Sequence, residues 1–485
     1  MITDAAYLDW LRSSDRKVLL VELEYYDPVA EDTGTFYLSD KGYNTNLSPT
    51  VQHREYPDDV RKVPSARRTL GQGRPSRGEL VVDNTNGAHD DWLTRYKFDG
   101  RAIRLLYGAP TWLYEDFRVV YAGITKDRAA RGIQELVFKF RDPEDFLDVP
   151  LHNATIASGP NAGDYQPVAY GYCYNVPAVL LDGTTHVYQV SDVAFTSVVL
   201  VKDEGKGPVG HTVDLAAGTI TLTSAAVGNI TVDLIGAKVG GTTLLKAGEI
   251  VDHIITTRTS LPAELYDSSA FVALDAAITW EHNLWSAGNV TALKAIEQLL
   301  ASVNARLSRT PEGLVTVVSL AEPGLMAEEA ITPDDYKVNT LQPIKAELPW
   351  NKARLGYRKN YFVQESLDTT LTEAERASLA REYLIVVDDN GVAGMHPLAS
   401  EPDLIETTLT NQADAQALLT ELLSIHSVER FWFELQAFAV MFQYGIGTTV
   451  SLTNHRYGLS AGSNFVVWDT DHDLTGGSSR LTLWR

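Results

Sequence analysis

Cysteine is nearly absent from the sequence, because Cys173 is the one thiol among 485 residues. A single cysteine excludes both a disulfide framework within the chain and a zinc site made of several cysteines. Cys173 stands between tyrosines in the stretch Tyr170–Tyr174. We expect it to be a small buried packing residue rather than a reactive thiol, since free cysteine behaves as a small apolar side chain.

Long apolar runs are also lacking. No stretch approaches the roughly 18 apolar residues that a membrane-spanning helix requires, so no membrane span is predicted. The first residues, Met1–Asp4, contain no basic region, and no apolar segment follows them as in a signal peptide. The sequence therefore predicts a protein that is made in a cytoplasm and stays soluble there.

Positive charge is scarce relative to negative charge. The chain has 63 acidic and 41 basic residues, which gives a formal net charge of −22. Lysine and arginine provide affinity for DNA by displacing counterions from phosphates, so this balance argues against a DNA-binding protein. An acidic surface would let nucleic acid pass without binding. Solubility alone is the simpler explanation of the charge.

The pattern of apolar residues changes along the chain. Residues 133–140 alternate, with Leu136, Phe138 and Phe140 on one face, and short strands of this kind predict a barrel or a sandwich. From about residue 290 the spacing is helical. The length predicts roughly three or four domains. We expect β-rich segments at 1–150, 151–247 and 331–485, with a small α/β segment at 248–330 that contains a helix and a hairpin. The last segment should hold two helices, one opened by a capping box at 372–375 and one capped by Asn411.

The stretch from residue 45 to 78 differs from its surroundings because it is polar and rich in basic residues. We predict an irregular arm or loop that lies on an acidic neighbour, and the alternative is a solvated, mobile loop. The candidate interface residues are Arg54, Arg61, Lys62, Arg67, Arg68, Arg74 and Arg77.

Motifs that would carry chemistry are weak. There is no His-Glu-x-x-His motif, and the most metal-like run is Asp469–Asp473. An EF-hand loop would need glycine and glutamate where this sequence has Leu474 and Arg480, so we predict a polar hairpin tip between strands. Gly458–Gly462 has the spacing of a Gly-x-Ser-x-Gly elbow, but a predicted strand follows it, which favours a hairpin loop. We predict no catalytic, cofactor-binding or metal-binding residues.

Five parts of the sequence carry a resemblance to known proteins: residues 96–105 with 119–123, 166–190, 292–318, 355–361, and 445–453 with 456–459. These stretches resemble proteins of the tail tip of long-tailed bacteriophages and related particles. The chain is similar to baseplate hub proteins, including the trimeric hub family of contractile phages. Distal tail proteins share the first barrel but generally lack the helix-hairpin element and a second barrel, which favours a hub.

The resemblance implies a fold that is mainly β with α+β parts. Two β-barrel hub domains, at 1–150 and at 331–485 with two helices, would bracket a β insertion domain at 151–247 and a small α/β domain at 248–330. It implies a structural virion protein and no enzyme: a homotrimer whose six barrels match the sixfold tail tube. Its partners would be the distal tail protein, the C-terminus of the tape-measure protein, a central fibre or spike, and DNA that passes through the channel without specific binding. No cofactor is implied.

Two other functions remain open. A polysaccharide-degrading tail enzyme would need two carboxyl groups at a fixed separation in one cleft, which a sequence does not reveal. A host-surface glycan-binding module would be displayed outward, and residues 151–247 are the segment in which we would expect it.

Overall fold

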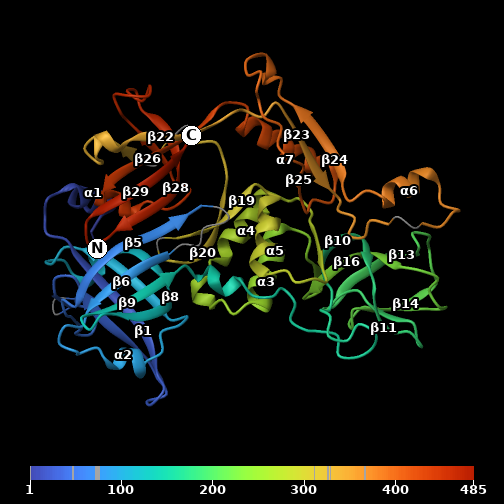
Figure 1. Cartoon of the computed structure of the whole chain (residues 1–485), viewed down its shortest axis with the longest axis horizontal. Helices are drawn as coiled ribbons and strands as arrows, with labels where there is room; N and C mark the ends of the chain where they lie inside the picture. Colours follow the sequence, from blue (N-terminus) through green and yellow to red (C-terminus); the bar gives the residue numbers. More distant parts are fainter. Residues whose placement is uncertain are drawn as a thin grey trace. The chain divides into compact units, whose positions relative to one another are not determined.

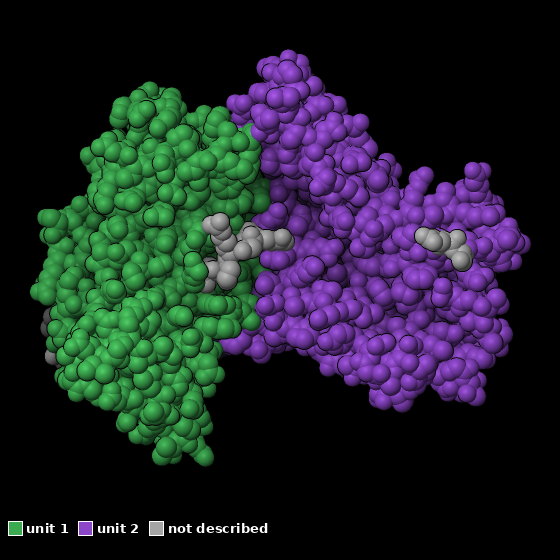
Figure 2. All heavy atoms as spheres, in the orientation of Figure 1, with its two compact units in different colours: residues 1–145, 307–347, 430–485 green, residues 146–306, 348–429 purple. Residues whose placement is uncertain are grey.

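The chain is described by a computed structural model at residues 2–45, 48–70, 77–310, 312–324, 327, 329–364 and 367–485. It divides into two compact units (Figure 2). Unit 1 contains Met1–Asp145, Leu307–Glu347 and Arg430–Arg485, and unit 2 contains Phe146–Arg306 and Leu348–Glu429. Strands make up 41% of the chain and helices 19%, which confirms the predicted mainly β class.

Unit 1 is built on one sheet, which has thirteen strands among the described residues. Its main path runs β2-β1-β7-β8-β9-β6-β5-β28-β29-β26-β22, while β27 pairs with β28 and β21 with β27. The small pair β3 and β4 lies apart from this path. The strands are β1 (Val18–Asp27), β2 (Asp32–Ser39), β3 (Tyr43–Asn44), β4 (Glu55–Tyr56), β5 (Val60–Thr69), β6 (Arg77–Asp83), β7 (Ala102–Gly108), β8 (Arg118–Arg131), β9 (Glu135–Arg141), β21 (Glu329–Ile331), β22 (Gln342–Glu347), β26 (Arg430–Phe438), β27 (Thr449–Leu452), β28 (Ser463–Asp473) and β29 (Ser478–Trp484).

The sheet joins segments from the two ends of the chain. Strand β5 pairs antiparallel with β28, with Thr69 opposite Asp469 and Arg67 opposite Asp471, and Figure 1 shows the blue strand beside the red one. The hydrophobic core of unit 1 likewise combines both segments, since it contains Phe138 from β9 and Leu483 from β29. Among the described strands the path ends at β2 and at β22, so the pairing closes no barrel. The mainly β class is confirmed, whereas the two closed barrels are not.

The prediction of an irregular basic arm is wrong for residues 60–69, because these form strand β5 between β6 and β28. Two irregularities of register, at Val60/Lys62 and at Lys62/Ser65, interrupt the alternation that would have marked a strand. Arg68 is buried at a position where a period-two pattern requires an apolar residue. The alternation of apolar and polar residues was therefore too irregular to predict strand β5 from the sequence.

Helices in unit 1 are short. Helix α1 (Asp4–Arg12) begins after Thr3, whose side chain accepts a hydrogen bond from the Ala6 amide at 3.3 Å. It buries Tyr7 and Trp10 against the core of the sheet. The remaining elements are α2 (Asp91–Thr94), η1 (Tyr114–Asp116), η4 (Val338–Thr340) and η6 (Ala439–Gln443).

The described residues of unit 2 form three sheets. The first has the order β13-β16-β10-β18, with β17 paired to β16, the second has the order β11-β12-β15-β14, and the third has the order β24-β23-β25. The strands are β10 (Val168–Pro177), β11 (Val179–Asp182), β12 (Val187–Gln189), β13 (Phe195–Asp203), β14 (His211–Asp214), β15 (Thr219–Leu222), β16 (Ile230–Val239), β17 (Thr242–Thr243), β18 (Asn283–Ser286), β23 (Lys352–Tyr357), β24 (Leu384–Asp389) and β25 (Ile405–Glu406).

Two helices of unit 2 begin at the predicted caps. Thr372 and Glu375 form the capping box of α6, and Asn411 caps α7 by accepting from the Asp414 amide at 3.0 Å. Helix α7 covers one side of the β23–β24 sheet, with Leu418 in their shared core (Figure 1). The elements are α3 (Ala247–Arg258), η3 (Ala263–Leu265), α4 (Ser268–Ala277), α5 (Ala292–Ala301), α6 (Glu373–Leu379), η5 (Val392–Gly394) and α7 (Gln412–Ile425).

Two elements span the unit boundary along the chain, namely η2 (Pro143–Leu147) and β19 (Ala305–Arg309). Strand β19 pairs with β20 (Val315–Ser319) in the hairpin that the sequence predicts there. None of the helices formed by the described residues has the length and apolar character needed to cross a membrane.

Candidate functional site

Most of the predicted basic residues that the structure describes lie on the paired strands β5 and β6, where Arg67 stands opposite Arg77. Arg61 at the start of β5 lies 2.9 Å from the Asp83 carboxylate and 3.0 Å from that of Glu135. Lys62 and Arg77 are exposed. Arg74 lies outside the described residues.

The other predicted arginines contact acidic or aromatic side chains of unit 1. Arg54 lies over the Tyr37 ring at 4.9 Å and 3.8 Å from Glu22. Arg67 reaches across to β28, where its guanidinium donates to the Asp469 carboxylate at 2.8 Å. Arg54 and Arg67 are therefore paired with carboxylates of unit 1, and these acidic partners belong to the same chain.

Arg68 belongs to a buried cluster of charges in unit 1. It lies over the Tyr121 ring at 4.6 Å and 3.9 Å from the Asp142 carboxylate, which also accepts from the Tyr121 hydroxyl at 3.0 Å. Arg309 approaches the other oxygen of Asp142 at 3.8 Å and contacts Glu144. Burial lowers the pKa of Arg309 to about 10 and raises the pKa of Tyr121 well above its ordinary range. Such a cluster fixes the ends of β5, β8 and β9 relative to one another.

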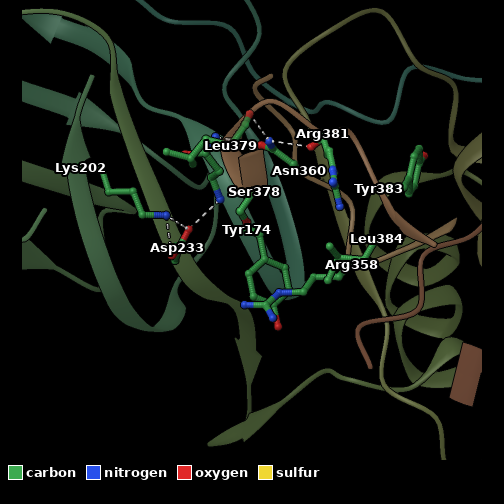
Figure 3. A pocket seen from close by; sticks show the side chains of 11 residues that line it. Tyr174, Lys202, Asp233, Arg358, Asn360, Ser378, Leu379, Arg381, Tyr383 and Leu384 are labelled. Atoms are coloured by element: carbon green, nitrogen blue, oxygen red, sulfur yellow. Dashed lines mark hydrogen bonds and ion pairs between the residues drawn. The ribbon is translucent and has the colours of Figure 1, made fainter. Parts of the chain in front are cut away.

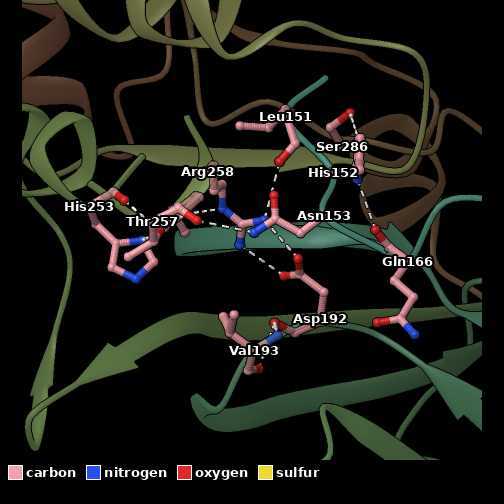
Figure 4. A network of polar contacts seen from close by, with 12 residues as sticks. Leu151, His152, Asn153, Gln166, Asp192, Val193, His253, Thr257, Arg258 and Ser286 are labelled. Atoms are coloured by element: carbon pink, nitrogen blue, oxygen red, sulfur yellow. Dashed lines mark hydrogen bonds and ion pairs between the residues drawn. The ribbon is translucent and has the colours of Figure 1, made fainter. Parts of the chain in front are cut away.

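A second buried network holds unit 2 together (Figure 4). The guanidinium of Arg258, at the end of α3, donates to both carboxylate oxygens of Asp192 at 2.7 and 3.0 Å and to the Tyr170 hydroxyl at 2.7 Å. The Tyr170 hydroxyl also lies 2.9 Å from Nδ1 of His253. Burial raises the pKa of Tyr170 to about 12 and lowers that of His253. With Tyr170 and Arg258 buried, this network braces α3 against β10.

His152 extends the same region. Its Nδ1 lies 2.9 Å from the Gln166 carbonyl oxygen and its Nε2 lies 3.1 Å from the Ser286 hydroxyl (Figure 4). Burial lowers the pKa of this histidine. Both ring nitrogens are therefore engaged in positioning the chain segments that enter β10 and leave β18.

The metal-like run does not form the predicted hairpin tip. Asp469–Asp473 is the end of strand β28, and the turn to β29 falls at residues 474–477. Asp469 pairs with Arg67, Asp471 accepts from the Ser65 hydroxyl at 2.7 Å, and His472 lies 2.7 Å from the Ser479 hydroxyl. In the described part of the chain, no three His, Cys, Asp or Glu side chains are grouped so that they could hold a metal ion.

The Gly-x-Ser-x-Gly stretch is a hairpin loop, as predicted. Gly458–Gly462 connects β27 to β28, so a strand and not a helix follows Ser460. The exposed serine of a nucleophile elbow depends on a strand-to-helix turn. This loop therefore lacks the geometry of that motif.

Sequence reasoning missed a polar pocket in unit 2 (Figure 3). Its volume is about 130 Å³. Strands β10, β13 and β16 supply one wall, and the segments after β23 and before β24 supply the other. The lining residues are Tyr174, Asn175, Lys202, Asp233, Arg358, Asn360, Ser378, Leu379, Arg381, Tyr383 and Leu384.

Hydrogen bonds fix the walls of this pocket. Nζ of Lys202 donates to both oxygens of Asp233 at 2.9 and 2.8 Å, and Asp233 also accepts from the Asn175 amide at 2.7 Å. The Asn175 side chain donates to the Asn360 side chain at 2.8 Å. Asn360 in turn donates to the carbonyl oxygens of residues 379 and 381 at 2.9 and 3.0 Å. The pocket is thus built on a rigid frame.

The charge of the pocket is positive. Arg358 lies over the Tyr174 ring at 4.1 Å, and burial raises the pKa of Tyr174 to about 12. Asp233 is the one carboxylate among the described lining residues, and Lys202 neutralises it. Hydrolysis of a glycosidic bond ordinarily uses two carboxyl groups. This pocket is therefore suited to binding an anion and not to that hydrolysis.

Comparison with known proteins gives similarity in structure only. No family model matches the sequence, and no curated protein matches it. The tail protein from Neisseria meningitidis MC58 is similar with a TM-score of 0.39 and 9% identity, covering 96% of each chain. The 43 kDa tail protein of prophage MuSo2 from Shewanella oneidensis has a TM-score of 0.41 and 8% identity, covering 96% of this chain and 98% of that one. Prophage tail protein gp18 from Listeria monocytogenes EGD-e has a TM-score of 0.45 and 7% identity, covering 97% and 94%.

Proposed function

We propose that the chain is a structural subunit of a phage-like tail tip, a baseplate hub that assembles as a homotrimer. One observation carries the proposal. The stretches near the two ends that resemble hub barrels, at residues 96–105 with 119–123 and at 445–453, fall in unit 1 on strands β7, β8 and β27. The pair β5 and β28 links them within one sheet.

Open sheet edges support assembly with other chains. Strand β22 ends the path of the sheet, most of its residues are exposed, and Ile344 on it is 49% exposed. Strand β2 ends the path at the opposite side. An unpaired edge is a template for main-chain pairing with another subunit. We assign β22 and β2 as the edges through which neighbouring subunits make contact.

The proposed assembly derives sixfold symmetry from three chains. Each chain would supply two barrel-like halves, one from residues 1–150 and one from the parts of residues 331–485 that belong to unit 1, so a trimer would present six to the tail tube. The two helices of residues 331–485, α6 and α7, belong to unit 2. Residues 151–247 form the proposed insertion domain and 248–330 the proposed α/β domain. The distal tail protein would lie on the tube side and a central fibre or spike on the other.

The channel of this trimer would hold the C-terminus of the tape-measure protein until DNA passes. A net charge of −22 per chain supports such a role, because an acidic wall repels phosphates. Lys62 and Arg77, which are exposed, remain proposed contacts to an acidic neighbour. No catalytic step is part of this function.

Labelling the particle tests the location directly. Antibodies raised against the full chain would be applied to particles that incorporate it and viewed by negative-stain electron microscopy. The proposal predicts label at the tail tip. Label on the capsid or along the tail, or a chain that is absent from purified particles, would contradict it.

A further inference from the structure

The pocket of unit 2 contains more positive charge than the surrounding chain neutralises. Lys202 is paired with Asp233 through two hydrogen bonds. For Arg358 and Arg381, the described residues provide no carboxylate within ion-pair distance of the guanidinium. Two guanidinium groups at one small cavity are unexpected in a chain whose net charge is −22. They create a local site for a negative group.

Contacts within unit 2 hold both the side chain and the backbone of Arg358 in place. Its guanidinium lies over the Tyr174 ring at 4.1 Å (Figure 3), and its amide donates to the carbonyl oxygen of residue 409 at 2.7 Å. Its φ of 51° is in the left-handed region, which residues other than glycine rarely adopt. Asn175 on the facing wall has the same φ of 51°. Such backbone conformations persist where surrounding contacts enforce them, and they are concentrated at binding sites.

A guanidinium stacked on a ring keeps its N–H groups in one plane. That plane matches the two oxygens of a carboxylate or of a phosphate, which it can bind through two parallel hydrogen bonds. Arg381 adds a second set of donors to the same cavity (Figure 3). The site therefore favours an oxyanion over a neutral group.

The rest of the lining suits a sugar ring. Tyr174 and Ser378 each contribute a hydroxyl that can hydrogen-bond the hydroxyl groups of a sugar. The Tyr383 hydroxyl donates to Glu406 at 3.2 Å, so its ring is fixed in place. A volume of about 130 Å³ is close to that of a cavity that holds one benzene molecule, about 150 Å³. It accommodates one terminal ring and not a long chain.

We infer that this pocket binds the acidic end group of a saccharide, with Arg358 and Arg381 on its oxyanion and the hydroxyls of Tyr174 and Ser378 beside the sugar. The oxyanion is a carboxylate in a uronic or sialic acid, or a phosphate in a phosphorylated sugar. This binding is separate from the proposed assembly role, because it uses residues of unit 2 that are not at the edges of the large sheet. A chain that forms trimers could lack it, and a chain that remains monomeric could have it.

Calorimetric titration of the full chain tests the inference. The probes are glucuronic acid, N-acetylneuraminic acid, glucose 6-phosphate and, as the neutral control, glucose. We expect saturable binding of at least one acidic probe with a Kd on the order of 1 mM, as for other small ligands of this size. Glucose should bind at least about tenfold more weakly, since it cannot pair with the guanidinium groups. The acidic probe that binds identifies the oxyanion.

Three variants separate the pocket from general charge effects. Arg358→Gln and Arg381→Gln should each weaken binding of the acidic probe about tenfold or more. Arg354→Gln removes an equal charge from an exposed position on neighbouring β23 and should leave the Kd unchanged. If Arg358→Gln fails to fold, exposed Arg381 still provides the test. Absence of saturation with every acidic probe, equal affinity for glucose, or unaltered binding by both pocket variants would overturn the inference.

Discussion

The side chains of Arg258 and Asp192 form a bidentate ion pair, with N···O distances of 2.7 and 3.0 Å and only 1% and 6% of the two side chains exposed. The pair connects the end of α3 to the segment after β12. A buried charge depends on its partner, because water cannot replace the lost contact. This relationship makes unit 2 sensitive to the loss of either residue.

The variant Arg258→Met should lower the free energy of unfolding of unit 2 by about 3 to 5 kcal/mol, since it leaves the Asp192 carboxylate buried and unpaired. Urea denaturation of the full chain measures the change. The control is Lys206→Gln, whose partner Asp368 lies 3.5 Å away with the Lys206 side chain 54% exposed. That exposed pair should contribute much less, because solvent screens the two charges. Equal losses in the free energy of unfolding for the two variants would show that the buried Arg258–Asp192 pair does not stabilise unit 2 more than an exposed pair does.

Residues 1–145 should not form a stable domain when expressed alone. Without the C-terminal segment, strand β5 loses its partner β28, and the core loses Leu435, Leu483 and their neighbours. An unpaired strand edge beside an incomplete core promotes aggregation. We expect this fragment to be insoluble or to lack a cooperative thermal transition. Co-expression with residues 307–347 and 430–485 as separate chains should increase its solubility, and a cooperatively folded fragment on its own would contradict the shared core.

Acid should destabilise unit 1 through His472. Burial, together with Arg68, lowers the pKa of His472 from its ordinary 6.5 to about 3. In the unfolded chain the His472 imidazole is therefore protonated below about pH 6.5, whereas in the folded chain it is protonated only near pH 3. Stability falls as pH decreases through this window, by at most about 1.4 kcal/mol per pH unit from this one residue.

Replacing the histidine isolates its share of the pH dependence from that of the carboxylates. His472→Asn should show a smaller loss of stability between pH 6.5 and pH 4 than the parent chain in parallel urea titrations. His455→Asn, which changes an exposed histidine of the same unit, should follow the parent curve. An unchanged slope for His472→Asn would contradict the burial of a neutral imidazole.

The thiol of Cys173 should be inert in the folded chain. It is buried in β10, and burial raises its pKa to about 12, so almost no thiolate exists at neutral pH. A thiol-reactive dye should label the chain only in denaturant, at a rate that follows the unfolding of unit 2. Stoichiometric labelling without denaturant within minutes would contradict the packing of β10.

Local patterns in the sequence predicted the regular elements well. The alternation of Leu136, Phe138 and Phe140 corresponds to β9, where all three are buried, and the caps at Thr372 and Asn411 begin α6 and α7. Each of these signals depends on neighbours within a few residues. The sequence therefore predicted element type wherever the period was undisturbed.

Such local patterns could not predict which distant segments pair or which residues meet in a pocket. The pairing of β5 with β28 joins residues about 400 positions apart, and bulges with a buried arginine concealed β5 itself. The pocket draws its arginines, Lys202 and Asp233 from segments that only the fold brings together. No short motif marks such a site, since the residues that meet are separated in the sequence by other elements.

The stoichiometry and symmetry of the assembled chain test the proposed trimeric hub most directly. Native mass spectrometry of the full chain, combined with electron microscopy of the same sample, measures both. A trimeric hub predicts a species of three times the 53.4 kDa chain mass, with threefold views around an open central channel. A chain that remains monomeric at every concentration, or three copies that enclose no channel, would contradict it.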